Sequence, residues 1–258
     1  MENVLIMFDS LLMAFSLYSR IPVPQAEWND RSMKYCICFL PLVGVVIGAV
    51  QYGLLLFLDI LNAGPVLRGA LLAFLPVFLS GGIHMDGFLD TCDAIHSWKG
   101  PEERLRILKD PHVGAFAVIG GLLYFLLAAG IWSEADTASA LTLSLVFVLS
   151  RALSAFSALF FPKAKKDGML RGETDPAAKG ASGAMAAAAL AAMAVMILTG
   201  RLQGVCGAAA SAAVLLIYYR TATRMFGGTT GDLAGWFLQL CELAAAGAVV
   251  LCGLVMTG

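Results

Sequence analysis

The chain has 258 residues, of which 59% are hydrophobic and only 14% are charged, and its formal net charge is -1. A soluble domain would carry about a quarter of its residues as charges, so this composition argues against one. The slight negative charge argues against nucleic acid as a partner, because binding to phosphate backbones requires a basic excess. The six cysteines are scattered without a Cys-x-x-Cys pair or a Cys/His cluster, and we read them as small apolar residues inside helices.

Apolar stretches long enough to cross a bilayer recur along the chain. A hydrocarbon core about 30 Å thick requires about 20 mostly apolar residues per helix. Residues 4–19 are a weaker candidate, because this stretch is short and contains Asp9, so it could lie in the interface, re-enter or cross at a tilt. The hydropathy criterion gives about seven spans, at residues 36–58, 69–85, 113–132, 141–161, 180–200, 202–219 and 233–257.

These spans predict an all-α fold, a polytopic transmembrane helix bundle in which residues 1–258 form a single integral membrane domain. The distribution of basic residues supports this list of spans. Connections between spans should lie alternately on the two sides of the membrane, and those on one side hold only Arg68 and Arg201. By the positive-inside rule the lysine- and arginine-rich side faces the cytoplasm. We therefore expect a multi-pass protein of the cell (inner) membrane, with the lipid bilayer as its partner. The rich side holds Arg20, Arg31, Lys34, Lys99, Arg104, Arg106, Lys109, Lys163, Lys165, Lys166, Arg171, Lys179, Arg220 and Arg224.

The most informative motif is Gly-Gly-Ile-His-Met-Asp-Gly-Phe-Leu-Asp-Thr-Cys-Asp-Ala at residues 81–94. Its carboxylates, Asp86, Asp90 and Asp93, are spaced i, i+4 and i+7 and would share one face of a helix. Their mutual repulsion would become coordination around a divalent cation, and oxygen ligands suit magnesium or manganese better than zinc. The alternative is an ordinary solvated helix end. His84 would point away from this face on a regular helix, unless the paired glycines break the helix there.

A short predicted helix begins at Pro101 and ends near Asp110, just before Pro111. Lys109 and Asp110 therefore lie at a sharp corner on the lysine- and arginine-rich side. A Lys-Asp pair at such a corner is usually surface decoration when taken alone.

A second loop motif, Arg-Met-Phe-Gly-Gly-Thr-Thr-Gly-Asp at residues 224–232, precedes the last span. Its backbone N–H groups and hydroxyls could hold phosphate oxygens at the positive end of the following helix. It is not a Walker loop, because no lysine follows the glycine, and a simple turn is the alternative. Arg224, Gly228, Thr230 and Asp232 are the candidate binding residues.

Two ionisable residues, Arg151 and Glu242, fall inside predicted spans. A charge within the membrane is costly, so each is a functional candidate by default. A structural ion pair, including one between the two residues, is the alternative. Together, a cation site, a phosphate-binding loop and basic residues on one membrane face indicate phosphoryl transfer from a nucleotide.

The quoted segments resemble the cobalamin synthase family, the adenosylcobinamide-GDP ribazoletransferases. The family pattern Gly-Gly-x-His-x-Asp-Gly-x-x-Asp-Thr-x-Asp matches residues 81–93, Lys-Asp-x-x-x-Gly matches 109–114, and Arg-x-x-Gly-Gly-x-Thr-Gly-Asp matches 224–232. The segments 19–24 and 40–44 resemble its opening, and Ser150-Arg151 its mid-chain Ser-Arg pair. The likeness covers nearly the whole chain. Ala94 and Pro111 depart from the pattern where a glycine and a serine are usual, without removing a candidate ligand.

The resemblance implies an enzyme that joins α-ribazole, or its 5′-phosphate, to adenosylcobinamide-GDP and releases GMP. It implies magnesium (Mg²⁺) as cofactor, held by Asp86, Asp90 and Asp93, with Asp90, Asp93 or His84 accepting the proton of the attacking hydroxyl. The other expected catalytic residues are Lys109, Asp110 and Arg151. The expected substrate-binding residues are Arg224, Gly228, Thr230, Asp232 and Glu242.

Two other functions remain open from the residues. A CDP-alcohol phosphotransferase shares the membrane setting and the nucleotide donor, but its wider spacing of aspartates is not found here. A transporter with an acidic ion site predicts charges near the bilayer midplane and two related halves. The acids here mostly border the predicted cytoplasmic connections, and we find no internal repeat.

Overall fold

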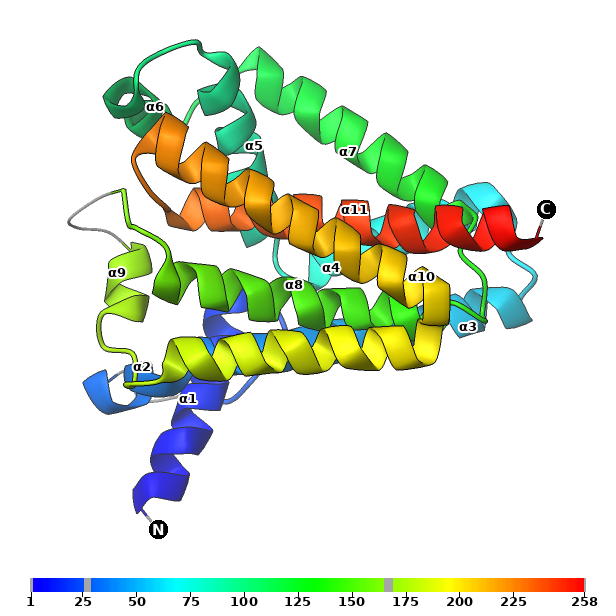
Figure 1. Ribbon diagram of the computed structural model, residues 1–258, viewed down its shortest axis with the longest axis horizontal. Helices are drawn as coiled ribbons and strands as arrows, with labels where there is room; N and C mark the ends of the chain where they lie inside the picture. The colour runs from blue at the N-terminus through cyan, green and yellow to red at the C-terminus, as the bar shows by residue number, and fades with distance from the viewer. Residues whose placement is uncertain (1, 26–28, 165–168, 258) are drawn as a thin grey trace.

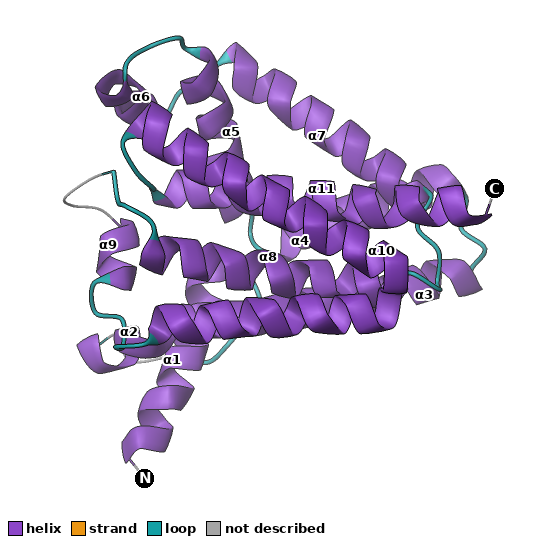
Figure 2. Cartoon of the chain, viewed as in Figure 1, coloured by secondary structure: helices purple, strands orange, loops and turns teal. Residues whose placement is uncertain are grey.

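The computed structural model describes residues 2–25, 29–164 and 169–257, and these parts are helical, with no strand among them (Figure 2). The expected all-α class is therefore confirmed. Lys165 and Lys166 of the predicted basic set lie outside the described residues. In chain order the elements are α1 (Glu2–Tyr18), α2 (Asp30–Cys36), the 3-10 helix η1 (Ile37–Phe39), α3 (Leu40–Ile60), α4 (Pro65–Leu79), α5 (Ile83–His96), α6 (Pro101–Ile107), α7 (Ala115–Ser133), α8 (Ala140–Phe160), α9 (Met169–Thr174), α10 (Ala181–Phe226) and α11 (Gly231–Thr257).

Five continuous helical stretches are long and apolar enough to cross a membrane, and the pair α4 and α5 makes a sixth if it is counted as one bent span. The 46-residue α10 doubles back at Arg201, where φ is 48° and ψ is -121° (Figure 1). The two halves of α10 correspond to the two spans expected at residues 180–200 and 202–219. The chain is thus a multi-pass membrane protein, and the expected number of about seven counts the halves of α10 separately.

The stretch expected to span as residues 69–85 is not one straight helix. The helix α4 ends at Leu79, and α5 departs from it at an angle of 97°. Gly81 and Gly82 join them with φ of 68° and 80°, a left-handed conformation that glycine adopts without strain. The paired glycines therefore turn α5 across the direction of the long helices, and α5 carries the acidic motif (Figure 1).

Small residues let the long helices approach closely. A side chain on Gly44 or Gly48 of α3 would lie 2.3 Å from the Phe147 carbonyl oxygen or 2.5 Å from that of Ser144, both on α8. This spacing of small residues four apart is typical of packed membrane helices. The main core also contains aromatic residues, and Tyr218 of α10 stacks on Phe237 of α11 with ring centroids 4.9 Å apart.

The N-terminal helix α1 does not run with the long helices. It crosses their direction at the end of the molecule where α2 and α9 lie (Figure 1). Its second half packs through Met13, Ala14 and Tyr18, whereas Val4 and Phe8 of its first half are exposed. Of the dispositions left open for residues 4–19, this arrangement favours one in the interface.

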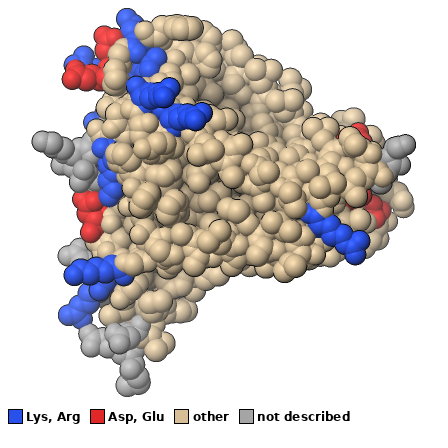
Figure 3. Space-filling view, in the orientation of Figure 1, with Lys and Arg blue, Asp and Glu red and all other residues tan. Residues whose placement is uncertain are grey.

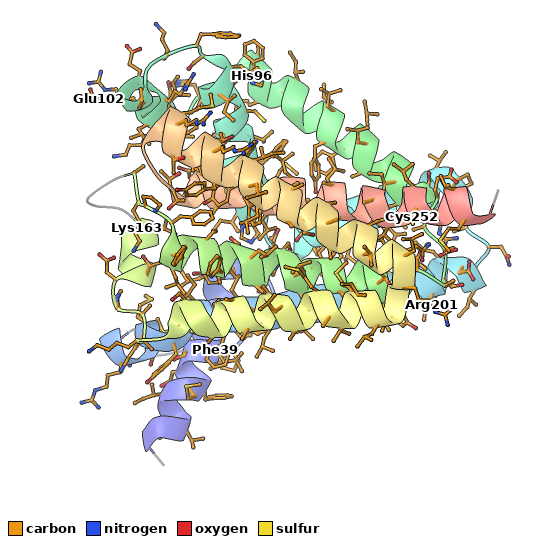
Figure 4. The ribbon with its side chains drawn as sticks, in the orientation of Figure 1. Phe39, His96, Glu102, Lys163, Arg201 and Cys252 are labelled. Atoms are coloured by element: carbon orange, nitrogen blue, oxygen red, sulfur yellow. The ribbon has the colours of Figure 1, made fainter. Side chains whose placement is uncertain are left out.

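Charged side chains gather at one end of the molecule. Figure 3 shows most lysine and arginine side chains at the end formed by α2, α6 and α9. Glu102 and Lys163 lie at this end in Figure 4, and Arg201 lies at the opposite end. We refer to the end with Glu102 and Lys163 as the charged end.

Candidate functional site

A cavity of about 410 Å³ opens among segments of the charged end. Helices far apart in the sequence form its wall together. The first turns of α5, which runs across the long helices, pack against the start of α11. The lining residues are Tyr18, Ile37, Leu40, Ile83, His84, Asp86, Leu108, Lys109, Ser154, Ala155, Ala158, Lys163, Leu170, Thr229, Thr230, Gly231, Asp232, Ala234 and Gly235. Five of them, His84, Asp86, Lys109, Thr230 and Asp232, are site residues predicted from the sequence.

The close contact of α5 and α11 depends on glycines. A Cβ atom at Gly87 would lie 2.7 Å from the Asp232 carbonyl oxygen, and one at Gly235 would lie 2.9 Å from that of His84. Only residues without a side chain permit these helix backbones to approach so closely. The contact brings Asp86 and Asp232, which are 146 positions apart in the sequence, into the lining of one cavity.

Asp90 lies one turn beyond Asp86 on α5 and is partly buried. Burial, together with the neighbouring charges of Asp86, Asp232 and Asp93, raises the pKa of the Asp90 carboxyl to about 6. The carboxylates of α5 therefore share one electrostatic site with Asp232, a residue that the sequence placed with the phosphate-binding loop. A cluster of like charges of this kind favours either a proton or a cation.

The third acidic residue of the motif, Asp93, has a different contact. Its two carboxylate oxygens accept hydrogen bonds from the backbone N–H groups of Gly114 (2.7 Å) and Ala117 (2.9 Å), at the start of α7. Asp93 thus caps α7 from the neighbouring helix, where the helix dipole favours a negative charge. A Cβ atom at Gly114 would lie 2.5 Å from the carboxylate, which explains the glycine of the Lys-Asp-x-x-x-Gly pattern.

The cation site predicted from Asp86, Asp90 and Asp93 remains a prediction. In the part of the chain that the structure describes, no three histidine, cysteine, aspartate or glutamate side chains converge as ready ligands. The chemistry of the cluster nevertheless fits a hard cation, because its carboxylates are oxygen donors and burial together with the charges of Asp86 and Asp232 raises the pKa of Asp90.

Lys109 and Asp110 separate at the corner before α7. Lys109 lines the cavity, whereas Asp110 is exposed and pairs with His112, whose Nδ1 lies 2.7 Å from Asp110 Oδ1. The side-chain and backbone hydrogen bonds from His112 lower the pKa of the Asp110 carboxyl. Asp110 is thus not among the residues that line the cavity.

The glycine-threonine loop is held by a segment that the sequence did not single out. Thr229 N donates to the Pro162 carbonyl oxygen (2.7 Å) and Ala164 N donates to that of Thr229 (3.0 Å), forming an isolated parallel bridge. Gly228 is required there, because its Cβ atom would lie 2.5 Å from Ala164 N. Thr230 Oγ1 accepts a hydrogen bond from Leu233 N (3.2 Å) and so caps the first turn of α11.

The same bridge brings Lys163 into the cavity lining, a residue missed as a site candidate. Its Nζ atom lies 2.8 Å from Asp175 Oδ1 and also contacts Thr174 Oγ1. No local motif marks Lys163, because its position depends on pairing with a loop more than sixty residues later. Lys163 and Lys109 supply positive charge to the wall that also carries Asp86 and Asp232.

Arg151 and Glu242 form an ion pair within the bundle. Arg151 Nη1 lies 2.5 Å from Glu242 Oε1, and only 1% and 6% of their side-chain surfaces are exposed. Ser150 Oγ also donates to Glu242 Oε1 at 3.0 Å. Neither charged residue lines the cavity, and the exposed Arg224 does not line it either. Of the two readings of the intramembrane charges, the structure favours the structural ion pair.

Comparison with known proteins gives one consistent family. A relative from Lachnoclostridium phytofermentans, named adenosylcobinamide-GDP ribazoletransferase, is 43% identical over 252 residues, which cover 97% of both chains. Relatives of the same name from Clostridium botulinum (strain Alaska E43) and Azorhizobium caulinodans are 30% and 33% identical. These alignments cover 92% and 90% of this chain, and 95% and 91% of the relatives. No solved structure matches the chain. The family model described as cobalamin-5-phosphate synthase matches residues 10–250, and the chain therefore belongs to the cobalamin-5-phosphate synthase family.

Proposed function

We propose that this chain joins α-ribazole, or its 5′-phosphate, to adenosylcobinamide-GDP with release of GMP, the step that completes the nucleotide loop of cobalamin. The names of its relatives support this reaction, since the likeness covers nearly all of both chains. The observation that carries the proposal is the cavity in which Asp86 and Asp232 lie in one wall with Lys109 and Lys163. Such a site can bind a diphosphate through its lysines and a cation through its carboxylates.

In this reaction a free ribose hydroxyl of the acceptor attacks the phosphorus on the cobinamide side of the diphosphate, so the 5′ position can carry a phosphate throughout. The new P–O bond forms as the bond to GMP breaks, and the proton of the attacking hydroxyl passes to a base. Of the candidate bases, His84 lines the cavity, and its Nε2 atom has no hydrogen-bond partner among the described residues. Burial and the charge of Arg151 lower the pKa of the His84 imidazole to about 3, so the imidazole is neutral. The negative charge of a bound diphosphate would raise that pKa, and we assign the role of proton acceptor to His84 in the substrate complex.

The lysines and the loop position the phosphates. Lys109 and Lys163 would neutralise the non-bridging oxygens, and Lys163 is ion-paired with Asp175. The start of α11 at Gly231 adds the positive end of a helix, next to Thr230. These groups stabilise the charge that develops as GMP leaves.

Magnesium is the cofactor that this acidic site fits. Asp86, Asp90 and Asp232 would hold it, and bound magnesium would neutralise charge on the diphosphate. Asp93, whose oxygens cap α7, would support the site by fastening α5 to α7. Binding of the metal ion by Asp93, which the sequence pattern predicts, stays a prediction.

The charged end would face the cytoplasm, where the nucleotide-activated substrate is available. The concentration of basic residues at this end supports that orientation (Figure 3). Cysteine introduced by Glu102→Cys at the charged end should react with a membrane-impermeant maleimide only after cells are broken. Thr137→Cys, in the connection between α7 and α8, should react in intact cells, and the reverse pattern would refute the orientation. Both variants should be made with the native cysteines replaced.

Product formation by purified protein in detergent tests the proposed function. Wild-type protein supplied with adenosylcobinamide-GDP, α-ribazole and magnesium should release GMP and the joined product in equal amounts. Asp86→Asn should lower turnover by at least about 100-fold, the scale of losing a charge that stabilises a transition state. Glu102→Gln, which changes an exposed carboxylate of α6, should retain wild-type turnover. Folded wild-type protein that forms no product would overturn the proposal.

A further inference from the structure

The residues that line the cavity fall into two chemically different groups, which we call its charged half and its apolar half. Its charged half contains Asp86, Lys109, Lys163 and Asp232, and the proposed reaction uses these residues. Its other half has no charged side chain among the described lining residues. That half is formed by Tyr18, Ile37, Leu40, Ser154, Ala155, Ala158 and Leu170, from α1, η1, α3, α8 and α9.

The apolar half is built into a hydrophobic cluster of its own. Tyr18, Ile37, Leu40, Ala155 and Ala158 belong to a set of buried residues separate from the main core of the bundle. Each of these five side chains is at least nine-tenths buried. The surface is therefore a fixed part of the fold, and small residues of α8 leave space in front of it.

From this division we infer that the apolar half binds the aromatic base of α-ribazole. This inference rests on the proposed function. It adds that α-ribazole enters the cavity and that its base, not its ribose, binds the apolar half. The base is a benzimidazole with an apolar ring edge, so its burial against aliphatic side chains is favourable. The free hydroxyls of its ribose would then point toward the charged half, where the diphosphate binds.

The other aromatic ring in the reaction fits this half poorly. The guanine of adenosylcobinamide-GDP carries several hydrogen-bond donors and acceptors on its edge. Buried polar groups without partners are costly, and among the described lining residues of this half the side-chain partners are the hydroxyls of Tyr18 and Ser154 alone. Polarity therefore distinguishes the two heterocycles and places the guanine outside the apolar half.

Size places the corrin ring outside the cavity as well. A volume of about 410 Å³ is near the lower end of the range for small-molecule sites, roughly 300–1,000 Å³. A nucleoside fits this volume, whereas a corrin ring with its side chains and adenosyl ligand is several times larger than a nucleoside. Only the diphosphate arm of adenosylcobinamide-GDP would reach into the charged half.

Filling the apolar half tests the inference. Ala158→Leu should raise the KM for α-ribazole by about tenfold or more, because added methyl groups in a fitted pocket discriminate on this scale. The KM for adenosylcobinamide-GDP should change less than about threefold on the same reasoning. A riboside of unsubstituted benzimidazole, which lacks the two methyl groups, should be affected less than α-ribazole. Ala187→Leu, at an exposed position of α10, is the matched control and should leave both KM values unchanged.

The opposite change keeps the test decisive if Ala158→Leu unfolds the protein. Leu40→Ala removes atoms from the same half, and it should shift the kcat/KM preference toward ribosides with bulkier bases. An unchanged KM for α-ribazole in folded Ala158→Leu protein, or an unchanged base preference in Leu40→Ala protein, would overturn the inference. Absence of turnover in the wild type would instead overturn the proposed function, so the two failures are distinguishable.

Discussion

The buried pair of Arg151 and Glu242 gives the prediction that separates a structural role from a catalytic one most clearly. Arg151→Met leaves the Glu242 carboxylate without its cationic partner inside the bundle. Removing one member of a buried ion pair typically costs about 3–5 kcal/mol, because the other charge remains desolvated. The exposed surface of these side chains, 1% and 6%, places the pair in that buried class.

The double variant Arg151→Met with Glu242→Leu removes both charges together. Replacing a buried pair by apolar residues of similar volume is often neutral or stabilising by about 1–4 kcal/mol. We therefore expect the single variant to lose thermal stability by roughly 10 °C, using about 2–4 °C per kcal/mol for chains near this size. The double variant should regain most of that loss.

Thermal unfolding in detergent and steady-state turnover should be measured on the same preparations. Neither residue lines the cavity, so the turnover of the double variant should stay within about tenfold of wild type. Loss of a catalytic group would lower turnover much further, by about 100-fold or more. A double variant that is as stable as wild type but about 100-fold slower would refute the structural reading and restore Arg151 or Glu242 to the active site.

Three further results are expected. Gly87→Ala should lower stability by about 1–3 kcal/mol and slow turnover, because the new Cβ atom would lie 2.7 Å from the Asp232 backbone. Gly53→Ala, which has open space around it, should leave stability and turnover unchanged. Equal effects of the two substitutions would contradict the close packing of α5 against α11. Asp93→Ala should destabilise the protein by about 0.5–2 kcal/mol through loss of the α7 cap, and an unchanged melting temperature would exclude that role. Because the folded pKa of Asp90 is raised from 3.8 to about 6, the folded state binds its proton more tightly than the unfolded state. Stability of the metal-free protein should therefore fall as pH rises from about 4 to 6, and Asp90→Asn should flatten that dependence in pH-dependent melting curves.

Much of the membrane architecture could be predicted from the sequence, because a bilayer imposes a length and a composition on each span. Arg201 interrupts two apolar runs, and the chain reverses there. The paired Gly81 and Gly82 predict a break in the helix, and they do separate α4 from α5, so the apolar stretch 69–85 is bent by 97° instead of straight. Hydropathy cannot locate such a break, because both sides of it are apolar.

The candidate site was predictable only where its geometry is local. Helical spacing predicted that Asp86 and Asp90 share one region of α5, and their charges are coupled. The same spacing could not reveal that Asp93 is engaged by α7, because its partners at Gly114 and Ala117 lie more than twenty residues away. Lys163 likewise reaches the cavity through a long-range bridge that has no sequence signal.

We propose that the acidic site at the start of α5 and α11 carries out transfer to α-ribazole that depends on a divalent metal ion. The most direct measurement is GMP and cobalamin product formed by purified protein in magnesium, in excess EDTA, and in EDTA followed by excess magnesium. We predict product with magnesium, loss of product in EDTA, and recovery when magnesium is restored. Undiminished product in EDTA would contradict the metal role of Asp86, Asp90 and Asp232.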